Sequence, residues 1–172
     1  LKIHRMNKFT FLLAVFLLTA TMLFAQSKSI PSVDVKTIDG TTFNTSNINN
    51  DGKPIVISFW ATWCKPCKLE YVFLKELEEH FSDNDELQII SISTDREYDN
   101  WEKYISNNSV KGIQLYSGSN TDFVKFYDIG ALPRFIFLDK EGRVISPDEI
   151  RPSNSKTLEK LEATVYNNVY KR

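Results

Sequence analysis

The chain has 172 residues, enough for one domain with a sizeable hydrophobic core. It carries 21 basic and 22 acidic residues, so its net charge of −1 gives no indication of a nucleic-acid partner. Two cysteines are too few for a small secreted domain that depends on several disulfides for its stability.

The N-terminus has the pattern of an export signal. Basic residues without acids precede an uncharged run of 17 residues, Phe9–Ala25. We expect residues 1–25 to be a secretory signal peptide, with retention as a membrane anchor as the alternative. No cysteine follows the run, which excludes a lipid-modified cysteine there. Residues 26–31 are then a linker, 32–172 form one domain, and export places the two thiols in an oxidising compartment.

The domain begins with patterns typical of β-structure. Asp39-Gly40 separates the β-prone runs 33–35 and 41–43, which predicts a hairpin with a two-residue turn. The nearly continuous apolar run Ile55–Trp60 predicts a central strand that is buried on both faces.

Helical and strand patterns alternate after this strand. Pro66–Phe81 is predicted to be a helix with an apolar face and a charged face, the apolar one made of Leu69, Val72, Phe73, Leu77 and Phe81. Further strands are predicted at 87–93, 113–116, 135–138 and 143–145, and helices around 101–105, 123–127 and 158–169. The alternation predicts an α/β fold with helices on both faces of the sheet, and the late hairpin makes the sheet mixed.

Both cysteines lie where the central strand ends and the first long helix begins, in Phe59-Trp60-Ala61-Thr62-Trp63-Cys64-Lys65-Pro66-Cys67. A Cys-x-x-Cys loop at this place indicates thiol redox chemistry. Amides at the helix N-terminus stabilise a thiolate, so Cys64 is the predicted nucleophile. Cys67, one turn further and predicted to be less exposed, would resolve the mixed disulfide. A bond between these two closes too small a loop to stabilise the fold much.

Neighbouring side chains are candidates for tuning the site. Lys65 adds positive charge that favours the thiolate, although it also fits a solvated lysine. Pro66 stiffens the first helical turn, where its missing N–H costs nothing. Trp60 is expected to lie mostly in the core, and Trp63 to form an apolar rim beside Cys64.

A metal site is not expected. Structural zinc needs four ligands, and the histidines are His4, in the signal segment, and His80, at the far end of the helix. We expect no cofactor.

The motifs together resemble the thioredoxin superfamily. Trp63-Cys64-Lys65-Pro66-Cys67, Leu132-Pro133 and the hairpin Asp139–Arg143 carry the resemblance. Within the superfamily, the exported TlpA/ResA-like thiol–disulfide oxidoreductases fit best, given the export signal and the Gly52-Lys53-Pro54 stretch. The resemblance covers roughly residues 30–170 and implies a thioredoxin-like fold, with a central mixed sheet and an N-terminal β-hairpin extension.

The resemblance also implies site residues. Pro133 would be a cis proline facing the cysteine pair, and the backbone of Leu132 would pair with a substrate strand. Three positions depart from the family pattern: Ser58 stands where cytoplasmic thioredoxins bury an acid, Val72 replaces a helix proline, and Arg134 replaces a threonine.

Asp95 has two interpretations. It follows the predicted strand 87–93, at the sheet edge where sites form, and the related branch often has an acid there that resembles a proton acceptor for Cys67. Alternatively, Thr94-x-x-Glu97 matches a capping box, which makes Asp95 an ordinary first-turn acid of the next helix.

We interpret the chain as an exported enzyme that reduces disulfides of other exported proteins and is recharged by an upstream thiol donor. Cytochrome maturation is the usual setting of such relatives, by resemblance only. The alternatives are a net disulfide oxidase, a non-catalytic thioredoxin-fold binding module and a peroxidase. We expect a monomer that contacts the membrane only through a retained N-terminal segment.

Overall fold

The computed structural model describes residues 30–48, 52–81, 86–108, 110, 112–146 and 151–170. The predicted signal peptide and most of the predicted linker lie outside these ranges, so their interpretation stays a prediction. None of the helices in the described ranges is both long and apolar enough to cross a membrane.

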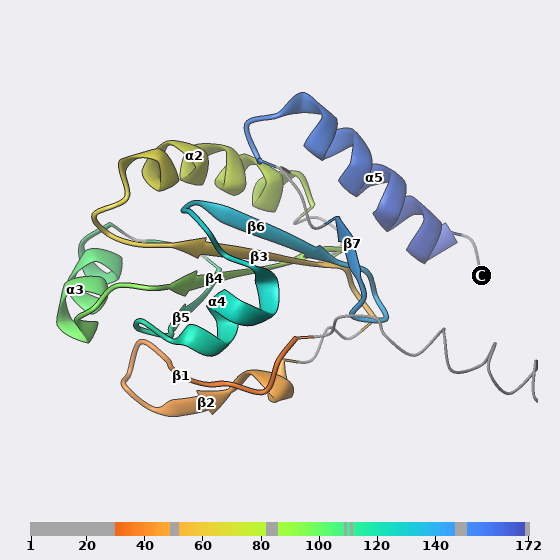
Figure 1. Ribbon diagram of the computed structural model, residues 1–172. Coiled ribbons are helices and arrows are strands. Elements are labelled where there is room, and N and C mark those ends of the chain that lie inside the picture. The colour runs from red at the N-terminus through yellow and green to blue at the C-terminus, as the bar shows by residue number, and fades with distance from the viewer. Residues whose placement is uncertain are drawn as a thin grey trace, which may run out of the picture.

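The strands of the described chain form one seven-stranded sheet in the order β2-β1-β5-β4-β3-β6-β7 (Figure 1). Their bounds are β1 (Asp34–Lys36), β2 (Thr42–Asn44), β3 (Ile55–Trp60), β4 (Gln88–Ser93), β5 (Ile113–Tyr116), β6 (Arg134–Leu138) and β7 (Val144–Ser146). β3 pairs in parallel with β4, and β4 with β5, whereas β6, β7 and the β1–β2 hairpin pair antiparallel. The predicted mixed sheet with an N-terminal hairpin extension is confirmed.

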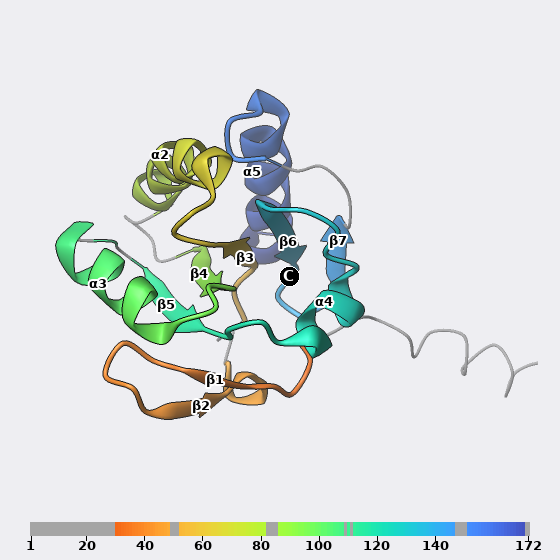
Figure 2. The same cartoon turned by 60° about the vertical axis from the view of Figure 1, so that its left-hand side comes forward.

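Helices cover both faces of the sheet, as predicted. Their bounds are η1 (Thr45–Asn47), α2 (Lys65–His80), α3 (Tyr98–Asn108), α4 (Thr121–Tyr127) and α5 (Ser155–Tyr170). α2 and α5 lie on one face, and α4 lies on the other, where the β1–β2 hairpin is added at the edge (Figures 1 and 2).

β3 is the centre of the core, and all six of its residues are buried. Because side chains alternate along a strand, its residues divide between the two faces. Val56 packs with residues of α2 and α5, whereas Ile57 and Phe59 pack with Phe123 and Tyr127 of α4. The predicted strand buried on both faces is therefore confirmed, and its carboxyl end leads directly into the cysteine motif.

The predicted apolar face of α2 is wrong in part. Three of its members are exposed, by 63%, 56% and 39% of their surface: Leu69, Val72 and Phe73. The buried stripe runs instead through Cys67, Glu70, Leu74, Leu77 and Phe81. The first turn of the helix is fixed by the packing of Cys67 at the end of β3, and this sets the rotation of every later turn. Glu70 therefore points inward, where other side chains satisfy its carboxylate.

The turn of the N-terminal hairpin is longer than predicted. Lys36 pairs with Thr42, so residues 37–41 connect the strands in place of a two-residue turn. The Asp39 carboxylate accepts hydrogen bonds from Thr37 and from Thr41 (backbone N–H at 3.2 Å), which closes the loop. Gly40 has a φ of 80°, a conformation that favours glycine.

Candidate active site

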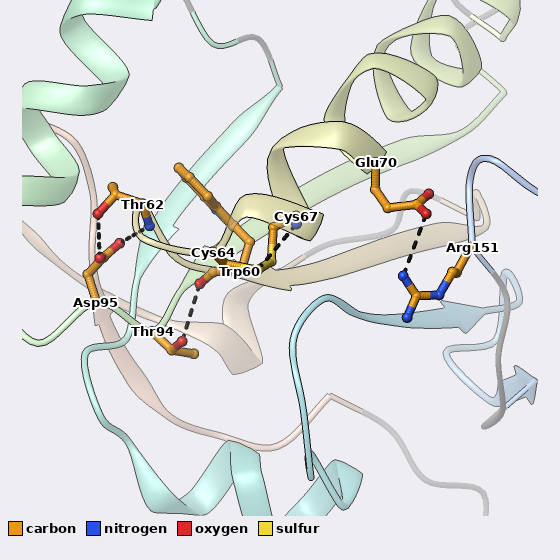
Figure 3. Close-up of a disulfide and its surroundings, with 8 residues drawn as sticks. All are labelled: Trp60, Thr62, Cys64, Cys67, Glu70, Thr94, Asp95 and Arg151. Carbon is orange, nitrogen blue, oxygen red and sulfur yellow. Dashed lines mark hydrogen bonds and ion pairs between the residues drawn. A yellow bond between two sulfur atoms is a disulfide. The ribbon is translucent and has the colours of Figure 1, made fainter.

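Cys64 and Cys67 form a disulfide at the start of α2 (Figure 3). Cys64 is the N-cap residue, and its Sγ accepts a hydrogen bond from the backbone N–H of Cys67 at 3.2 Å. The backbone N–H of Cys64 in turn donates to the carbonyl of Ala61 at 3.0 Å. The predicted place of Cys64 at a helix N-terminus is confirmed, and a helix amide is directed at its sulfur.

The two cysteines are equally buried, and the prediction that Cys67 is the less exposed one is wrong. Cys64 is 4% exposed and Cys67 is 5% exposed. Both belong to one cluster at the end of β3, against which Leu132 packs: Trp60, Ala61, Cys64, Cys67, Trp101 and Ile105. Trp101 and Ile105 of α3 help to bury both cysteines, and the sequence near the motif did not indicate this packing. A partner must therefore reach the sulfurs at a small exposed edge.

The two tryptophans of the motif lie as predicted. Trp60 is buried, with its ring 5.4 Å from that of Tyr104 between centroids. Trp63 is 69% exposed, next to Cys64 in the chain, and therefore offers an apolar surface to a partner. Lys65 and Pro66 are exposed in the first turn of α2.

The peptide bond between Leu132 and Pro133 is cis, as the resemblance implied. Leu132 is half-buried and packs against the cysteine cluster, so the loop before β6 lies beside the disulfide. Pro133 is buried and, with Arg134, lines a surface groove of about 600 Å³. A second groove of similar volume is lined by Thr62, Trp63 and Asp95.

Asp95 is 2% exposed and lies close to the motif, but its oxygens face Thr62 (Figure 3) and accept a further hydrogen bond from Ser93. The capping-box interpretation is wrong, because α3 begins at Tyr98 and Asp95 precedes its first turn. In the described ranges Asp95 has no hydrogen bond to either cysteine. Its role as the proton acceptor of Cys67 stays a prediction.

Glu70 is a buried polar residue of the site region that the sequence patterns did not single out. It lies one helical turn beyond Cys67 and is 7% exposed. Its carboxylate accepts hydrogen bonds from the N–H (3.0 Å) and hydroxyl (2.8 Å) of Ser153. It also lies 3.6 Å from Arg151 Nη1, a contact that Figure 3 shows. The signal for it was its spacing from Cys67 and Leu74, which places all three on one face of a helix.

A small cavity lies between α2 and the sheet. Its volume of about 20 Å³ is enough for one water molecule, and its walls include Cys67, Ser58, Ser91 and Trp60. Ser58 is buried and places a neutral hydroxyl where cytoplasmic thioredoxins have an acid. The indole Nε1 of Trp60 has no hydrogen-bond partner among the residues described.

No group of three metal-ligating side chains occurs in the described ranges. His80 ends α2, as predicted, and its Nε2 lies 3.0 Å from Glu162 Oε1 of α5. This contact joins the two helices that share a face of the sheet.

Comparison with known families agrees with this geometry. Residues 51–144, more than half of the chain, match a family model described as thioredoxin-like. The chain belongs to the thioredoxin-like family. Its named relatives include a thiol-disulfide oxidoreductase ResA of Bacillus cereus, 25% identical over 69% of this chain and 66% of that protein. ResA of Bacillus subtilis (strain 168) is 28% identical over 55% of this chain and 51% of its own length.

Solved structures described as thiol-disulfide oxidoreductases are also similar. A Bacteroides vulgatus protein assigned as a thiol-disulfide oxidoreductase has 38% identity and a TM-score of 0.68, over 82% of this chain and 91% of its own. A thiol-disulfide oxidoreductase from Bacteroides fragilis NCTC 9343 has 25% identity and a TM-score of 0.65, over 78% of this chain and all of its own (100%). The chain spans just under two thirds of the B. cereus ResA length and most of these two solved chains.

The positions that depart from the family pattern lie near the site but outside the cysteine cluster. Val72 is on the exposed face of α2, where it does not change the packing of Cys67. Arg134 opens β6 directly after the cis proline and is half-buried. This chain therefore differs from the family pattern on the exposed face of α2, in one wall of a groove and, at Ser58, in one wall of the small cavity.

Proposed function

We propose that the chain is an exported thiol–disulfide oxidoreductase that reduces disulfides in other proteins of the cell envelope. The observation that carries the proposal is the Cys64–Cys67 pair at the N-terminus of α2, with a helix amide directed at the Cys64 sulfur. Membership of the thioredoxin-like family and the activity named for its relatives support it.

The reaction is a two-step thiol exchange. In the reduced protein, the Cys64 thiolate attacks one sulfur of a partner disulfide; that S–S bond breaks, and the partner's other sulfur leaves as a thiolate. Cys67 then loses its proton and attacks Cys64, which forms the internal disulfide and releases the second partner sulfur as a thiolate. Two electrons pass to the partner, and the released thiolates take up two protons. An upstream dithiol donor returns the pair to its reduced form by the same steps in reverse.

The surrounding residues prepare this exchange. The N-terminal amides of α2 and the positive charge of Lys65 favour the thiolate of Cys64, and Pro66 holds the first turn. Trp63 supplies an apolar contact for the partner. The backbone at Leu132 and Pro133 receives the extended segment of the partner that contains its cysteine.

The residues between the cysteines support the proposed direction of electron flow. Strong oxidases have reduced forms that are unusually stable. The Lys65-Pro66 pair has no histidine that could add to the stabilisation of a thiolate in this loop. We therefore infer a reductase, with a reduction potential near the value of about −270 mV of thioredoxin and far from the value of about −120 mV of a strong oxidase.

The decisive experiment combines activity and trapping. The wild-type protein should reduce insulin disulfides, and Cys64→Ser should abolish this activity. Cys67→Ser should accumulate mixed disulfides with envelope proteins, because the resolving step is lost. If the wild-type protein does not reduce insulin and the Cys64→Ser variant still binds partners, a binding module would be favoured. Peroxide consumption would favour a peroxidase.

Export is a separate part of the proposal, and the N-terminal pattern supports it. A fusion of residues 1–31 to a reporter that is active only outside the cytoplasm tests it. N-terminal sequencing of the exported protein then shows whether the segment is cleaved or kept as an anchor.

A further inference from the structure

The carboxylate of Asp95 binds the segment that connects β3 to the nucleophilic cysteine. Asp95 Oδ2 accepts a hydrogen bond from the backbone N–H of Thr62 at 2.9 Å, and Oδ1 accepts one from the Thr62 hydroxyl at 2.7 Å (Figure 3). Oδ2 also accepts from the Ser93 hydroxyl at 2.8 Å, and that hydroxyl accepts from the Asp95 backbone N–H at 3.1 Å. Both oxygens of the carboxylate are therefore engaged by Thr62, two residues before Cys64.

The pairing of β3 with β4 ends next to the Asp95–Thr62 contact. The backbone N–H of Thr94 donates to the carbonyl of Trp60 at 2.9 Å, and the Thr94 hydroxyl lies 3.2 Å from the same oxygen. Beyond this point β3 has no further ladder partner on β4, since Trp60 and Ser93 are their last pair. The Asp95–Thr62 contact is thus the next link that holds the two chain segments together on the way to Cys64.

The turn itself transmits this link to the nucleophile. Cys64 N–H donates to the carbonyl of Ala61 at 3.0 Å, which closes a tight turn around Thr62 and Trp63. Thr62 sits inside this turn, so its attachment to β4 fixes where the turn lies. The position of the Cys64 sulfur relative to the helix amides, and that of the exposed Trp63, depend on it.

We propose that Asp95 is a positioning residue, whose bidentate contact with Thr62 fixes the turn that presents Cys64 and Trp63. The inference rests on the proposed thiol exchange, but it assigns to Asp95 a geometric role in place of proton transfer. A carboxylate is suited to it because one group accepts from a backbone N–H and a hydroxyl at once, and charge-assisted hydrogen bonds are stronger than neutral ones. Three donors occupy three of the roughly four acceptor sites of this carboxylate, and none of the three belongs to a cysteine.

The test uses the full chain and four variants. Thr62→Val removes one donor to Asp95 and keeps the size of the side chain, Thr62→Ser keeps the hydroxyl, and Asp95→Asn removes the charge. Ser119→Ala is the matched control, because this serine lines the same groove and none of the hydrogen bonds described for Asp95 involves it. The readouts are the rate of Cys64 alkylation by iodoacetamide against pH, in a Cys67→Ser background, and the rate of insulin reduction with both cysteines present.

We expect Thr62→Val and Asp95→Asn each to slow insulin reduction by about fivefold to tenfold, because small displacements of reacting groups lower the reaction rate. Each variant should also change the pH profile of Cys64 alkylation. Thr62→Ser and Ser119→Ala should stay within twofold of the wild type. The double variant should be less than twofold slower than Asp95→Asn alone, since both changes break one contact.

Two results would overturn the proposal. One is a Thr62→Val variant within threefold of the wild type in both assays. The other is an Asp95→Asn variant that changes only the alkylation profile of Cys67, measured in a Cys64→Ser background, which is the signature of a proton acceptor. Alkylation needs no protein substrate, so a failure of the proposed reductase activity would leave this test intact.

Discussion

Replacing Glu70 by glutamine should destabilise the protein strongly, although the two side chains have the same shape. The carboxylate is buried and accepts from the Ser153 N–H at 3.0 Å and the Ser153 hydroxyl at 2.8 Å, with Arg151 Nη1 at 3.6 Å. Glu70→Gln turns one acceptor oxygen into an N–H₂ donor. That donor then faces either the backbone N–H of Ser153 or the guanidinium of Arg151, and the N–H cannot turn elsewhere.

The magnitude follows from these contacts. A buried donor that loses its acceptor costs about 1–3 kcal/mol, and a hydrogen bond to a charged group is worth about 1.5–3 kcal/mol. The Arg151 side chain is half exposed, so its ion pair adds less than about 1 kcal/mol. The expected loss is about 2–4 kcal/mol, which corresponds to a fall in Tm of roughly 5–15 °C for a domain of this size.

Urea unfolding of the oxidised protein at pH 7 measures this loss. The matched control is Glu76→Gln, an exposed position of the same helix, which should stay within about 0.5 kcal/mol of the wild type. Ser153→Ala should give a smaller loss and should not add fully to that of Glu70→Gln, because the two share a contact. A loss below about 0.5 kcal/mol for Glu70→Gln would refute the reasoning and show that this carboxylate does not hold the loop before α5.

Four further predictions concern the cavity wall, two tyrosines and the exposed tryptophan. Ser58→Asp should cost little stability near pH 4 and progressively more toward pH 7. Burial raises the pKa of the new carboxyl above its unfolded value of about 3.9, and each pKa unit of difference costs about 1.4 kcal/mol once the carboxyl is ionised in the unfolded chain. Burial also raises the pKa of Tyr127, so its contribution to stability is intact below pH 10 and is lost as the pH rises further. Tyr127→Phe should remove that alkaline loss of stability without a cost at pH 7, since no partner for its hydroxyl occurs among the described residues. Tyr98→Phe should cost about 0.5–1.5 kcal/mol of stability, since the Tyr98 hydroxyl loses its hydrogen bonds to two hairpin carbonyls. Trp63→Ala should raise KM for a protein disulfide several-fold and leave unfolding unchanged, because the ring is 69% exposed.

Three outcomes would contradict these predictions. Equal losses for Ser58→Asp at pH 4 and pH 7 in urea titrations would show that the new carboxyl reaches solvent. A stability loss above about 1 kcal/mol for Tyr127→Phe at pH 7 would reveal a hydrogen bond of its hydroxyl. An unchanged KM for Trp63→Ala in steady-state kinetics would mean that partners dock elsewhere.

Local patterns were sufficient for much of the fold. β3 follows from six apolar residues in a row, and Cys64 lies at a helix N-terminus because a strand pattern ends and a helix pattern begins around it. The cis bond before Pro133 was not readable from composition or spacing and came from the resemblance alone. The central strand and the helix N-terminus depend on a few adjacent residues, which is why these two features could be recognised without coordinates.

The rotation of α2 and the partners of the buried acids could not be predicted in this way. An apolar stripe chosen from periodicity placed Leu69 inward, whereas Glu70 is the buried residue. Its partner Ser153 is 83 positions away in the sequence, and Thr62 is 33 positions from Asp95. Pairs at such distances are brought together only by the completed sheet, so the hydrogen-bond partners of these two acids could not be identified from the neighbouring sequence.

The two buried carboxylates hold the cysteine pair from opposite ends. Asp95 attaches the segment before Cys64 to β4, and Glu70 attaches the helix after Cys67 to the loop that leads into α5 (Figure 3). Both charges are satisfied by hydroxyl and backbone donors inside the protein, so each acid acts on the site through the segment that it holds. The geometry of the disulfide is therefore set partly by residues outside the cysteine motif. Substitutions at Thr62 or Ser153 should accordingly alter the site while the motif from Cys64 to Cys67 stays unchanged.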